Sequence, residues 1–361
     1  MAEEFVYLMA VDTSAMLLQE TPLPDDLDLS WLESPADWGI AAKPGKRGLT
    51  LDEINVGPYG EVPPTAGDQT MRPRGAVARR GVPHIGYTLK KDDVWAKNAT
   101  LLYEEAVQRQ WSSATDIPWD TLEELPEDIE LAMSQLCTFL TEVEFIAGDT
   151  PGQWLPSISN EHYEVKLYLA SQIMDEARHL DVFRKRALAN GGGLMSGGPG
   201  SGLRSIIAAR DFTEMSAIMH IIGEGFIQTL FRSGELLSHN EAEKRMFRLA
   251  VQDESRHVSF GVMHMKHILE TEPERREEIH SYLDSGEEIF AGTGVTATGG
   301  SIESLAILLG GGRDHMDEGL RKLLAVRKRQ VNEYMHRLQV AGLGERRERM
   351  TDQFSPFLDP E

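Results

Sequence analysis

The chain has 361 residues and a single cysteine, and its 36 basic and 58 acidic side chains give a formal net charge of −22. Cys137 alone cannot form an intrachain disulfide, a four-thiolate iron–sulfur cluster or a cysteine-rich zinc site. The acidic excess argues against a nucleic-acid-binding protein, because phosphate neutralisation needs clustered Lys and Arg. No window approaches the roughly 18 uninterrupted apolar residues of a membrane span, and the start lacks the basic residues of a signal peptide. We therefore expect a cytoplasmic protein without membrane association.

Residues 1–91 are expected to form an irregular N-terminal extension. Residues 1–70 carry 13 acidic and 3 basic side chains, with many Pro and Gly after position 21. Residues 72–91 reverse the sign, with six basic side chains and no acid: Arg72, Arg74, Arg79, Arg80, Lys90 and Lys91. This basic segment is either a solvated arm that pairs with acidic surface or a docking site for an anionic substrate or protein.

Helical periodicity begins near residue 92 and continues to about residue 343, which leaves 344–361 as a C-terminal tail. Helical runs are predicted over 126–148, 160–189, 203–237, 240–270, 274–290, 302–309 and 313–342, with Pro151 just beyond the end of the first. The glycine-rich segment 191–202 lacks the ending of a phosphate-binding loop and is expected to be a connection. No stretch shows sustained period-two alternation, so the sequence predicts an all-α domain over 92–343.

Two five-residue segments of the helical region are nearly identical: Asp175-Glu-Ala-Arg-His179 and Asp253-Glu-Ser-Arg-His257. In each, Glu and His stand three apart, so a helix places the carboxylate and the imidazole on one face. Two such helices facing each other would bring both pairs to one point. Buried carboxylates need compensation, and a metal is one of few adequate partners. A dimetal bundle combines two such pairs with one Glu from each of two other helices.

Two further acids occur ahead of the repeats. Glu224 is the only acid in the apolar run 217–227, and it precedes Glu254 by 254 − 224 = 30 residues. Ahead of the first repeat, Glu142 and Glu144 are both candidates. Glu144 shares a helical face with apolar residues and precedes Glu176 by 176 − 144 = 32 residues, so we prefer it and keep Glu142 as the alternative.

The repeats also indicate which residues would support the candidate metal ligands. A metal-bound imidazole needs an acceptor for its other ring nitrogen. Asp175 could reach His257, and Asp253 could reach His179, each from the opposite helix. Two arginines of the same repeats would balance these carboxylates, Arg178 and Arg256. The alternative is that both repeats are surface segments with pairs inside one helix.

These residues resemble the ferritin-like di-iron carboxylate superfamily, in particular its branch with ribonucleotide reductase small subunits, bacterial multicomponent monooxygenase hydroxylases and para-aminobenzoate N-oxygenases. The resemblance spans about residues 100–270 and implies a ferritin-like four-helix bundle with additional helices. It also implies a cofactor of two iron ions, or of one manganese and one iron. The implied ligands are Glu144, Glu176, His179, Glu224, Glu254 and His257.

The chain departs from the family pattern at two positions. Radical-forming reductase subunits carry a Tyr one turn after the first metal His, and the residue here is Phe183. The N-oxygenases carry an additional metal His where this chain has Ala250. His220, one turn before Glu224, either replaces that ligand or is a core histidine that supports the site.

The resemblance and the ligand set together predict an O₂-activating oxygenase that hydroxylates or N-oxygenates a small organic substrate. Four side chains near the ligands are pocket candidates or plain core residues: Glu142, Phe145, Phe183 and Phe226. The chain shows no flavin fingerprint and no cluster cysteines, so a separate reductase or ferredoxin would supply electrons. A homodimer is expected by analogy. A radical-generating subunit like those of ribonucleotide reductase and a metal-storage protein are the alternatives.

Overall fold

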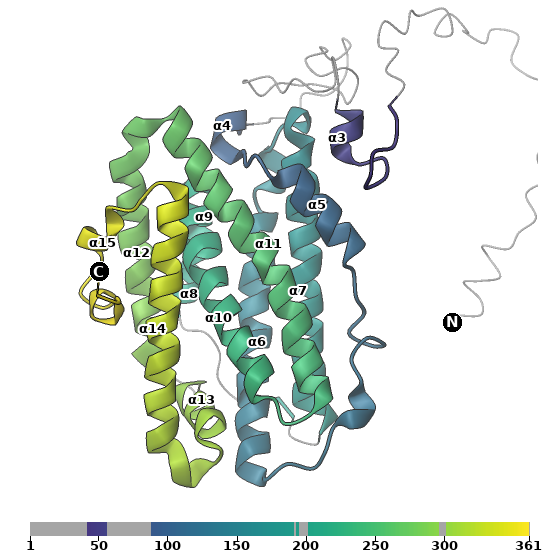
Figure 1. The fold of residues 1–361 in the computed structure, drawn as a ribbon, viewed down its shortest axis with the longest axis vertical. Coiled ribbons are helices and arrows are strands. Elements are labelled where there is room, and N and C mark those ends of the chain that lie inside the picture. Colours follow the sequence, from purple (N-terminus) through teal and green to yellow (C-terminus); the bar gives the residue numbers. More distant parts are fainter. Residues whose placement is uncertain (1–41, 56–87, 191–192, 195–200, 296–300, 361) are drawn as a thin grey trace, which may run out of the picture. The chain divides into compact units, whose positions relative to one another are not determined.

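The computed structural model describes residues 42–55, 88–190, 193–194, 201–295 and 301–360 (Figure 1). Most of the expected N-terminal extension lies outside these residues, including Arg72, Arg74, Arg79 and Arg80 of the basic segment. Most of the glycine-rich connection also lies outside them. The predicted divisions of the chain at residues 91 and 343 stay predictions.

Four helices form the bundle that carries the repeats. They are α6 (Glu127–Gly152), α7 (Tyr163–Ala189), α10 (Glu224–Leu237) and α11 (Glu241–Thr271). Helix α6 packs along α7, α10 packs along α11, and α7 also contacts α11. In the described part of the chain, β pairing is limited to two isolated bridges, so the all-α prediction is confirmed.

Further helices cover this bundle (Figure 1). Helix α5 (Ala99–Gln108) packs on α7 and α11, and α12 (Arg276–Val295) packs against residues 217–223. Helix α13 (Ser301–Gly310) lies on α6, and α14 (Met316–Ala341) lies on α13 and α10. The short helices are α3 (Leu51–Ile54), α4 (Lys91–Val94), α8 (Ser201–Arg204), α9 (Phe212–Ser216) and α15 (Arg346–Arg349).

The ends of the long helices have local causes. The Asn240 side chain caps α11 by accepting a hydrogen bond from the backbone N–H of Glu243 at 2.9 Å. Helix α14 ends at Ala341 and is followed by Gly342, whose φ of 97° is a left-handed backbone conformation that residues with a Cβ rarely adopt. The Gly342 N–H bonds back to the carbonyls of Leu338 and Gln339, which closes the last turn.

Two boundary predictions were wrong. Pro151 lies inside the last turn of α6, which ends at Gly152, and not beyond the helix. The predicted helix over 203–237 is broken into α8, a 3₁₀ turn (Ser205–Ala208), α9, a π-helical turn (Ala217–Gly223) and α10. The break follows from Asp211, whose side chain accepts the backbone N–H of Glu214 at 2.8 Å and starts α9 as a new helix.

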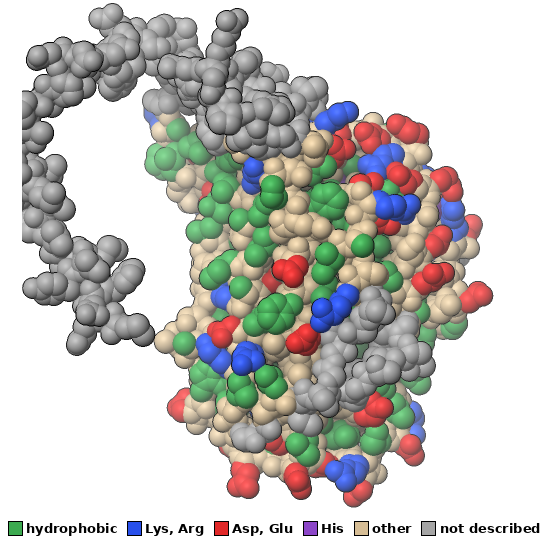
Figure 2. All heavy atoms as spheres, turned by 180° about the vertical axis from the view of Figure 1, so that it is seen from behind, with side chains coloured by type: hydrophobic (Ala, Val, Ile, Leu, Met, Phe, Trp, Pro, Cys, Tyr) green, Lys and Arg blue, Asp and Glu red, His purple; other side chains and the backbone are tan. Residues whose placement is uncertain are grey.

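The described helices bury their apolar faces in two clusters. The larger cluster includes Phe212, Phe260 and Tyr334, and the second includes Phe183 and Phe247. The face in Figure 2 shows hydrophobic side chains interspersed with acidic and basic ones. Among the described helices, none has the length and apolarity that a membrane crossing requires.

Candidate metal centre

The two repeats face each other in the bundle, one on α7 and one on α11, and the structure brings six side chains together as two overlapping groups. The first group consists of Glu144, Glu176, His179 and Glu254, and the second of Glu176, Glu224, Glu254 and His257. Each residue offers one ligand-type atom, and the atoms of each group lie within 4.8 Å of one another. Two glutamates, Glu176 and Glu254, belong to both groups, so the geometry could accommodate two neighbouring cations with these carboxylates shared.

Both imidazoles turn Nδ1 toward the shared carboxylates. His179 Nδ1 lies 3.2 Å from Glu176 Oε2 and 3.1 Å from Glu254 Oε1. His257 Nδ1 lies 2.9 Å from Glu254 Oε2 and 3.1 Å from Glu176 Oε1. It is also 3.8 Å from Glu224 Oε1. Each imidazole therefore meets the Glu of its own helix and the Glu of the facing helix.

The backbone around Glu224 is unusual. Glu224 is the first residue of α10 and directly follows the π-helical turn Ala217–Gly223. Such turns are frequent at functional sites, because the additional residue in the turn changes which side chains face inward. A Cβ at Gly261 of α11 would lie 2.4 Å from the Cβ of His220 in this turn. Only glycine therefore permits so close an approach of α11 to the turn.

The charge balance of the site shows whether a metal pair fits it. All six side chains are at most 4% exposed. One carboxylate oxygen of each glutamate has no hydrogen-bond partner among the described residues, namely Oε1 of Glu144, Glu176, Glu224 and Glu254. For the two shared glutamates this oxygen lies near an imidazole, but without hydrogen-bond geometry. Buried carboxylates in this state are unfavourable unless a cation meets them, so the donor set fits two metal ions.

The four carboxylates differ in pKa. Burial and then repulsion from Glu176 raise the pKa of Glu144 well above its ordinary value. Burial and then repulsion from Glu254 raise the pKa of Glu224 in the same way. Burial also acts to raise the pKa values of Glu176 and Glu254, but the imidazoles outweigh it and hold both values below the ordinary range. The unshared glutamates are therefore the ones that most need a cation in order to ionise.

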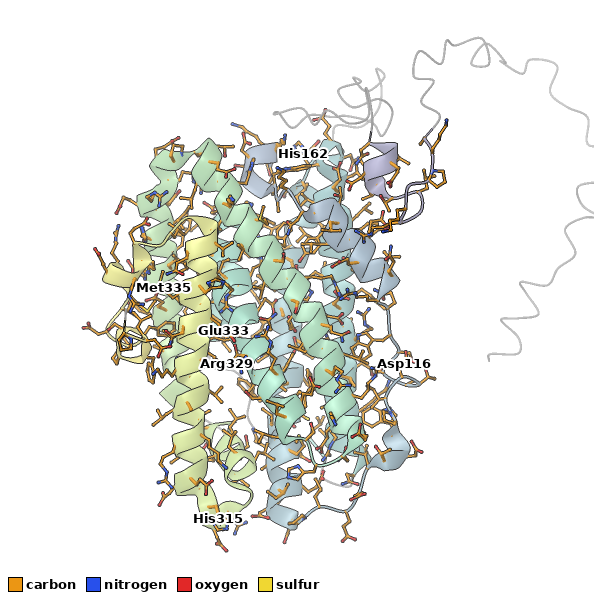
Figure 3. All side chains as sticks on the ribbon, in the orientation of Figure 1. Asp116, His162, His315, Arg329, Glu333 and Met335 are labelled. Atoms are coloured by element: carbon orange, nitrogen blue, oxygen red, sulfur yellow. The ribbon has the colours of Figure 1, made fainter. Side chains whose placement is uncertain are left out.

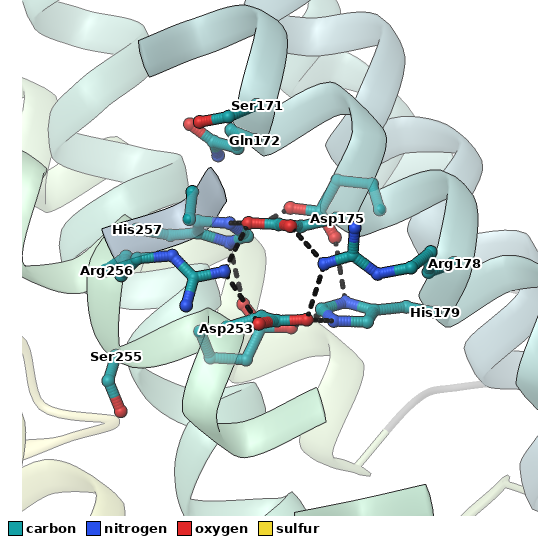
Figure 4. A network of polar contacts seen from close by, with 12 residues as sticks. Ser171, Gln172, Asp175, Arg178, His179, Asp253, Ser255, Arg256 and His257 are labelled. Atoms are coloured by element: carbon teal, nitrogen blue, oxygen red, sulfur yellow. Dashed lines mark hydrogen bonds and ion pairs between the residues drawn. The ribbon is translucent and has the colours of Figure 1, made fainter. Parts of the chain in front are cut away.

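The other ring nitrogen of each imidazole, Nε2, lies against one aspartate (Figure 4). His179 Nε2 lies 3.2 Å from Asp253 Oδ2, and His257 Nε2 lies 3.3 Å from Asp175 Oδ2. Each aspartate thus receives the imidazole of the facing helix, in the crossed arrangement expected from the repeats. An Nε2–H that donates to the aspartate leaves the Nδ1 lone pair directed at the glutamates.

Arg178 and Arg256 complete this network. Arg256 Nη2 donates to Asp175 Oδ2 at 2.7 Å and to Asp253 Oδ1 at 2.6 Å. Arg178 Nη2 donates to Asp253 Oδ2 at 3.1 Å and also pairs with Asp175. Burial alone would raise the pKa of Asp253, but the hydrogen bond from His179 and the two arginine charges hold that pKa below its ordinary range. Asp253 therefore stays ionised as an acceptor for the imidazole.

The sequence analysis missed Trp111, which lies between α5 and α6. Its Nε1 donates to Asp253 Oδ2 at 2.8 Å. Its ring is stacked on His179 with centroids 6.3 Å apart, and the Arg178 guanidinium carbon lies 5.2 Å from the ring centroid. Trp111 and Asp253 are 142 residues apart, so no local spacing could have revealed the contact.

His220 lies outside both ligand groups. Its Nδ1 is 2.9 Å from Ser216 Oγ, and its Nε2 is 3.2 Å from Gln172 Oε1. Burial and then the charges of His257 and His264 lower the pKa of His220 to about 3. The structure thus places it as a neutral, hydrogen-bonded core residue beside the centre.

The structure separates the four pocket candidates. Glu142 has a side chain 40% exposed and pairs with Arg204 at 3.3 Å, whereas Glu144 faces the centre. Phe145 is 53% exposed. Phe183 is buried in the core, with its ring tilted against those of Phe231 and Phe247. Phe226 alone of the four lines the cavity described next.

A cavity of about 730 Å³ adjoins the centre. Glu144 and Glu224, the two unshared glutamates, both lie in its wall. Most other lining side chains are apolar, including the rings of Phe139, Phe226 and Phe290. Among the described residues, the remaining polar lining side chains are Thr150, Arg327, Gln330 and Gln353. An apolar cavity with a few polar groups is typical of small-molecule sites.

No protein-family model matches the chain, and no curated protein matches it in sequence. Three solved structures with a similar fold are variants of R2-like ligand-binding oxidases. One has an aerobically reconstituted Mn/Fe cofactor (TM-score 0.51, 18% identity), one an anaerobically reconstituted Mn/Fe cofactor (0.53, 17%) and one an aerobically reconstituted Fe/Fe cofactor (0.52, 18%). Each comparison covers 68% of this chain and 94% of the other. The predicted ferritin-like fold is confirmed, and the chain has the fold of R2-like ligand-binding oxidases.

Proposed function

We propose that this protein is an O₂-activating dimetal oxidoreductase that oxidises a small, mainly apolar organic molecule. The observation that carries this proposal is the position of Glu144 and Glu224, each of which belongs to one ligand group and also lines the cavity. A molecule in the cavity would therefore lie directly beside both cation sites. The reconstituted Mn/Fe and Fe/Fe cofactors of the oxidases with the same fold support the choice of metals.

The six ligand-type residues would hold the two ions, with Glu176 and Glu254 shared. Four carboxylates neutralise two divalent cations, and oxygen with imidazole donors suits iron and manganese better than copper or structural zinc. When bound, the metal pair would supply the electron transfer that reduces O₂. Asp175 and Asp253 would keep the imidazoles in the tautomer that presents Nδ1, and the apolar cavity wall would exclude water.

Hydroxylation and N-oxygenation both fit the site. In either reaction one atom of O₂ enters the substrate and the other leaves as water, which requires two electrons and two protons from outside. The cysteine count of one leaves no internal iron–sulfur relay, so we propose a separate reductase or ferredoxin as donor. The expected homodimer is part of the same proposal.

Metal loading followed by O₂ exposure tests this function. We expect the chain reconstituted with ferrous iron without O₂ to bind two ions and to develop a new optical absorbance when O₂ is added. Glu176→Ala and Glu224→Ala should each reduce metal binding while helical content is kept, and the exposed Glu142→Ala is the matched control. Fewer than two ions in the wild type, or no optical change, would contradict the proposal. A stable radical signal in paramagnetic resonance would favour the radical-generating alternative.

A further inference from the structure

We infer that Gln172 of α7 donates a hydrogen bond from its Nε2 to a small anion that binds the cation beside His257. The ligand class is a monovalent anion of a few atoms, and azide is its probe. This inference rests on the proposed function in one respect, because it takes the two ligand groups as cation sites. It adds a residue that binds the incoming anion and a difference between the two sites.

Gln172 lies one helical turn before Glu176, and residues four apart on a helix share a face. The side chain of Gln172 is completely buried. On α11, the corresponding residue one turn before Glu254 is the apolar Ala250, which is also buried. The two nearly identical repeats therefore differ at this position, and only α7 places a polar side chain there.

The orientation of the Gln172 amide is set by His220. His220 Nε2 lies 3.2 Å from Gln172 Oε1, and His220 Nδ1 lies 2.9 Å from Ser216 Oγ. The lowered pKa of His220 leaves its imidazole neutral, with a single N–H. Because an amide oxygen only accepts, this N–H lies at Nε2, and Nδ1 accepts from the Ser216 hydroxyl. The amide oxygen of Gln172 is thus occupied, and its Nε2 remains as a donor for another group.

Gln172 Nε2 has no hydrogen-bond acceptor among the described residues. It donates neither to Glu176 nor to Glu224, and Oε1 of each of these carboxylates is also without a hydrogen bond. The amide therefore does not serve to hold a glutamate in place. A buried N–H without an acceptor is unfavourable, and a ligand with a lone pair would remove that cost.

The Gln172 amide lies beside the second ligand group. The charges of His257 and Glu176, both members of that group, act on the pKa of His220, which holds the amide. Figure 4 shows Gln172 on the His257 side of the network. Neither Gln172 nor His220 lines the cavity of about 730 Å³, so a ligand that reaches this amide must be small.

The charge balance explains why an anion needs this donor. Four carboxylates already neutralise two divalent ions, so the net charge of the loaded centre attracts a further anion only weakly. A hydrogen bond to a charged ligand is stronger than one between neutral groups. Since α11 has Ala250 at the matching position, Gln172 would favour anion binding at the cation beside His257 over the cation beside His179.

Azide titration of the cobalt-loaded full-length chain tests the inference, because the visible absorption bands of Co²⁺ change when a ligand binds it. Gln172→Met keeps the length of the side chain and removes the amide. Its azide dissociation constant should rise at least about tenfold, whereas its Co²⁺ affinity should stay within about twofold. Ser216→Ala releases only His220 and should weaken azide binding by a smaller factor. The control Arg329→Gln removes a surface cation that pairs with Glu333 at 2.8 Å on α14 (Figure 3), and it should leave azide binding unchanged.

Three results would overturn the inference: a wild type that binds cobalt but no azide, unchanged azide affinity in Gln172→Met, or a loss of Co²⁺ affinity as large as the loss of azide affinity. If Gln172→Met does not fold, Ser216→Ala decides, because weaker azide binding supports the inference and unchanged binding overturns it. Each of these results leaves the proposed function standing if the iron-loaded chain still responds optically to O₂. Loss of that response, with azide binding that depends on Gln172, would contradict the proposed function alone. A chain that binds no metal would overturn both.

Discussion

Two groups of buried carboxylates lie in the same helical domain, and their surroundings differ. Glu130 and Glu243 enclose Arg186, which pairs with Glu130 at 2.8 Å and with Glu243 at 2.7 Å. Among the described residues, the four glutamates of the candidate metal centre have no Lys or Arg ion-pair partner, and each keeps one carboxylate oxygen without a hydrogen bond. We therefore take the first group as an internal ion-pair cluster and the second as a site that is completed by added cations.

The pKa values of Glu243 and of the two unshared glutamates follow the same division, whereas the pKa values of Glu176 and Glu254 are lowered by the imidazoles. Burial acts to raise the pKa of Glu243, but hydrogen bonds from His239 and the charge of Arg186 lower it to about 2. At the candidate metal centre, burial and repulsion raise the pKa values of Glu144 and Glu224. Burial alone therefore does not distinguish a metal-binding carboxylate from a structural one. The distinction is whether a side-chain cation, such as Arg186, already pairs with the carboxylate.

Removal of the internal cation should give the largest effect on the stability of the metal-free protein. Arg186→Met leaves two buried carboxylates without their partner and should lower the free energy of unfolding by about 3–5 kcal/mol. Denaturant unfolding with chelator present measures this change independently of metal. Lys185→Met is the matched control, since Lys185 pairs with Asp181 at the surface and should contribute under about 1 kcal/mol. If both variants lowered the free energy of unfolding equally, Arg186 would not be the cation that stabilises the buried ion-pair cluster.

Acid should weaken the ion-pair cluster through Glu243. Its folded pKa is lowered to about 2 from an ordinary value of 4.5, so its stabilisation is present above the unfolded pKa and is lost as pH falls toward the folded pKa. This shift corresponds to about 3 kcal/mol. Between pH values of about 5 and 2, the wild type should therefore lose more stability than Glu243→Gln, measured by denaturant unfolding at each pH. Parallel pH profiles would contradict the assignment.

Added metal should stabilise the protein through the four glutamates of the candidate metal centre and not through the ion-pair cluster around Arg186. Ferrous or manganous ions at about 100 times the dissociation constant should raise the free energy of unfolding by about 2.7 kcal/mol for each site. Glu254→Ala removes a shared ligand and should abolish the gain at both sites, whereas Glu144→Ala should affect one site more than the other. Arg186→Met should keep the full gain if it folds. Calorimetric melting with and without metal distinguishes these cases.

The aspartates behind the imidazoles should give a smaller effect on metal affinity. Asp175→Asn and Asp253→Asn each replace the acceptor of an imidazole Nε2–H, and loss of such a partner typically weakens metal binding about 10–100-fold. Asp253→Asn should be the more severe, because Asp253 also accepts from Trp111. Competition with a metal indicator measures both affinities, and a larger effect of Asp175→Asn would reverse the predicted order.

The sequence predicts the helices and the repeats better than it predicts the contacts between helices. The two repeats show which Glu and His share a face, and the crossed pairs of Asp175 and Asp253 follow once the helices face each other. The π-helical turn before Glu224 could not be predicted, because it depends on how α9 and α10 are joined. Phe145 reads as a pocket candidate yet is exposed, since its neighbour Glu144 occupies the inward face. Partners such as Arg186 with Glu243, 57 residues apart, require the tertiary structure.

The smallest expected effect concerns Trp111. Its hydrogen bond to Asp253 breaks the near symmetry of the candidate metal centre. Its indole donates to Asp253, and Asp175 has no tryptophan partner in the described part of the chain. Trp111→Phe keeps an aromatic ring against His179 but removes the N–H donor and one ring of the buried indole, so the free energy of unfolding should fall by at least about 1 kcal/mol. Metal affinity should fall less than in Asp253→Asn, and only at the site of His179. Because the two sites share Glu176 and Glu254, an equal loss at both would show that the hydrogen bond acts through the shared carboxylates and not through His179 alone.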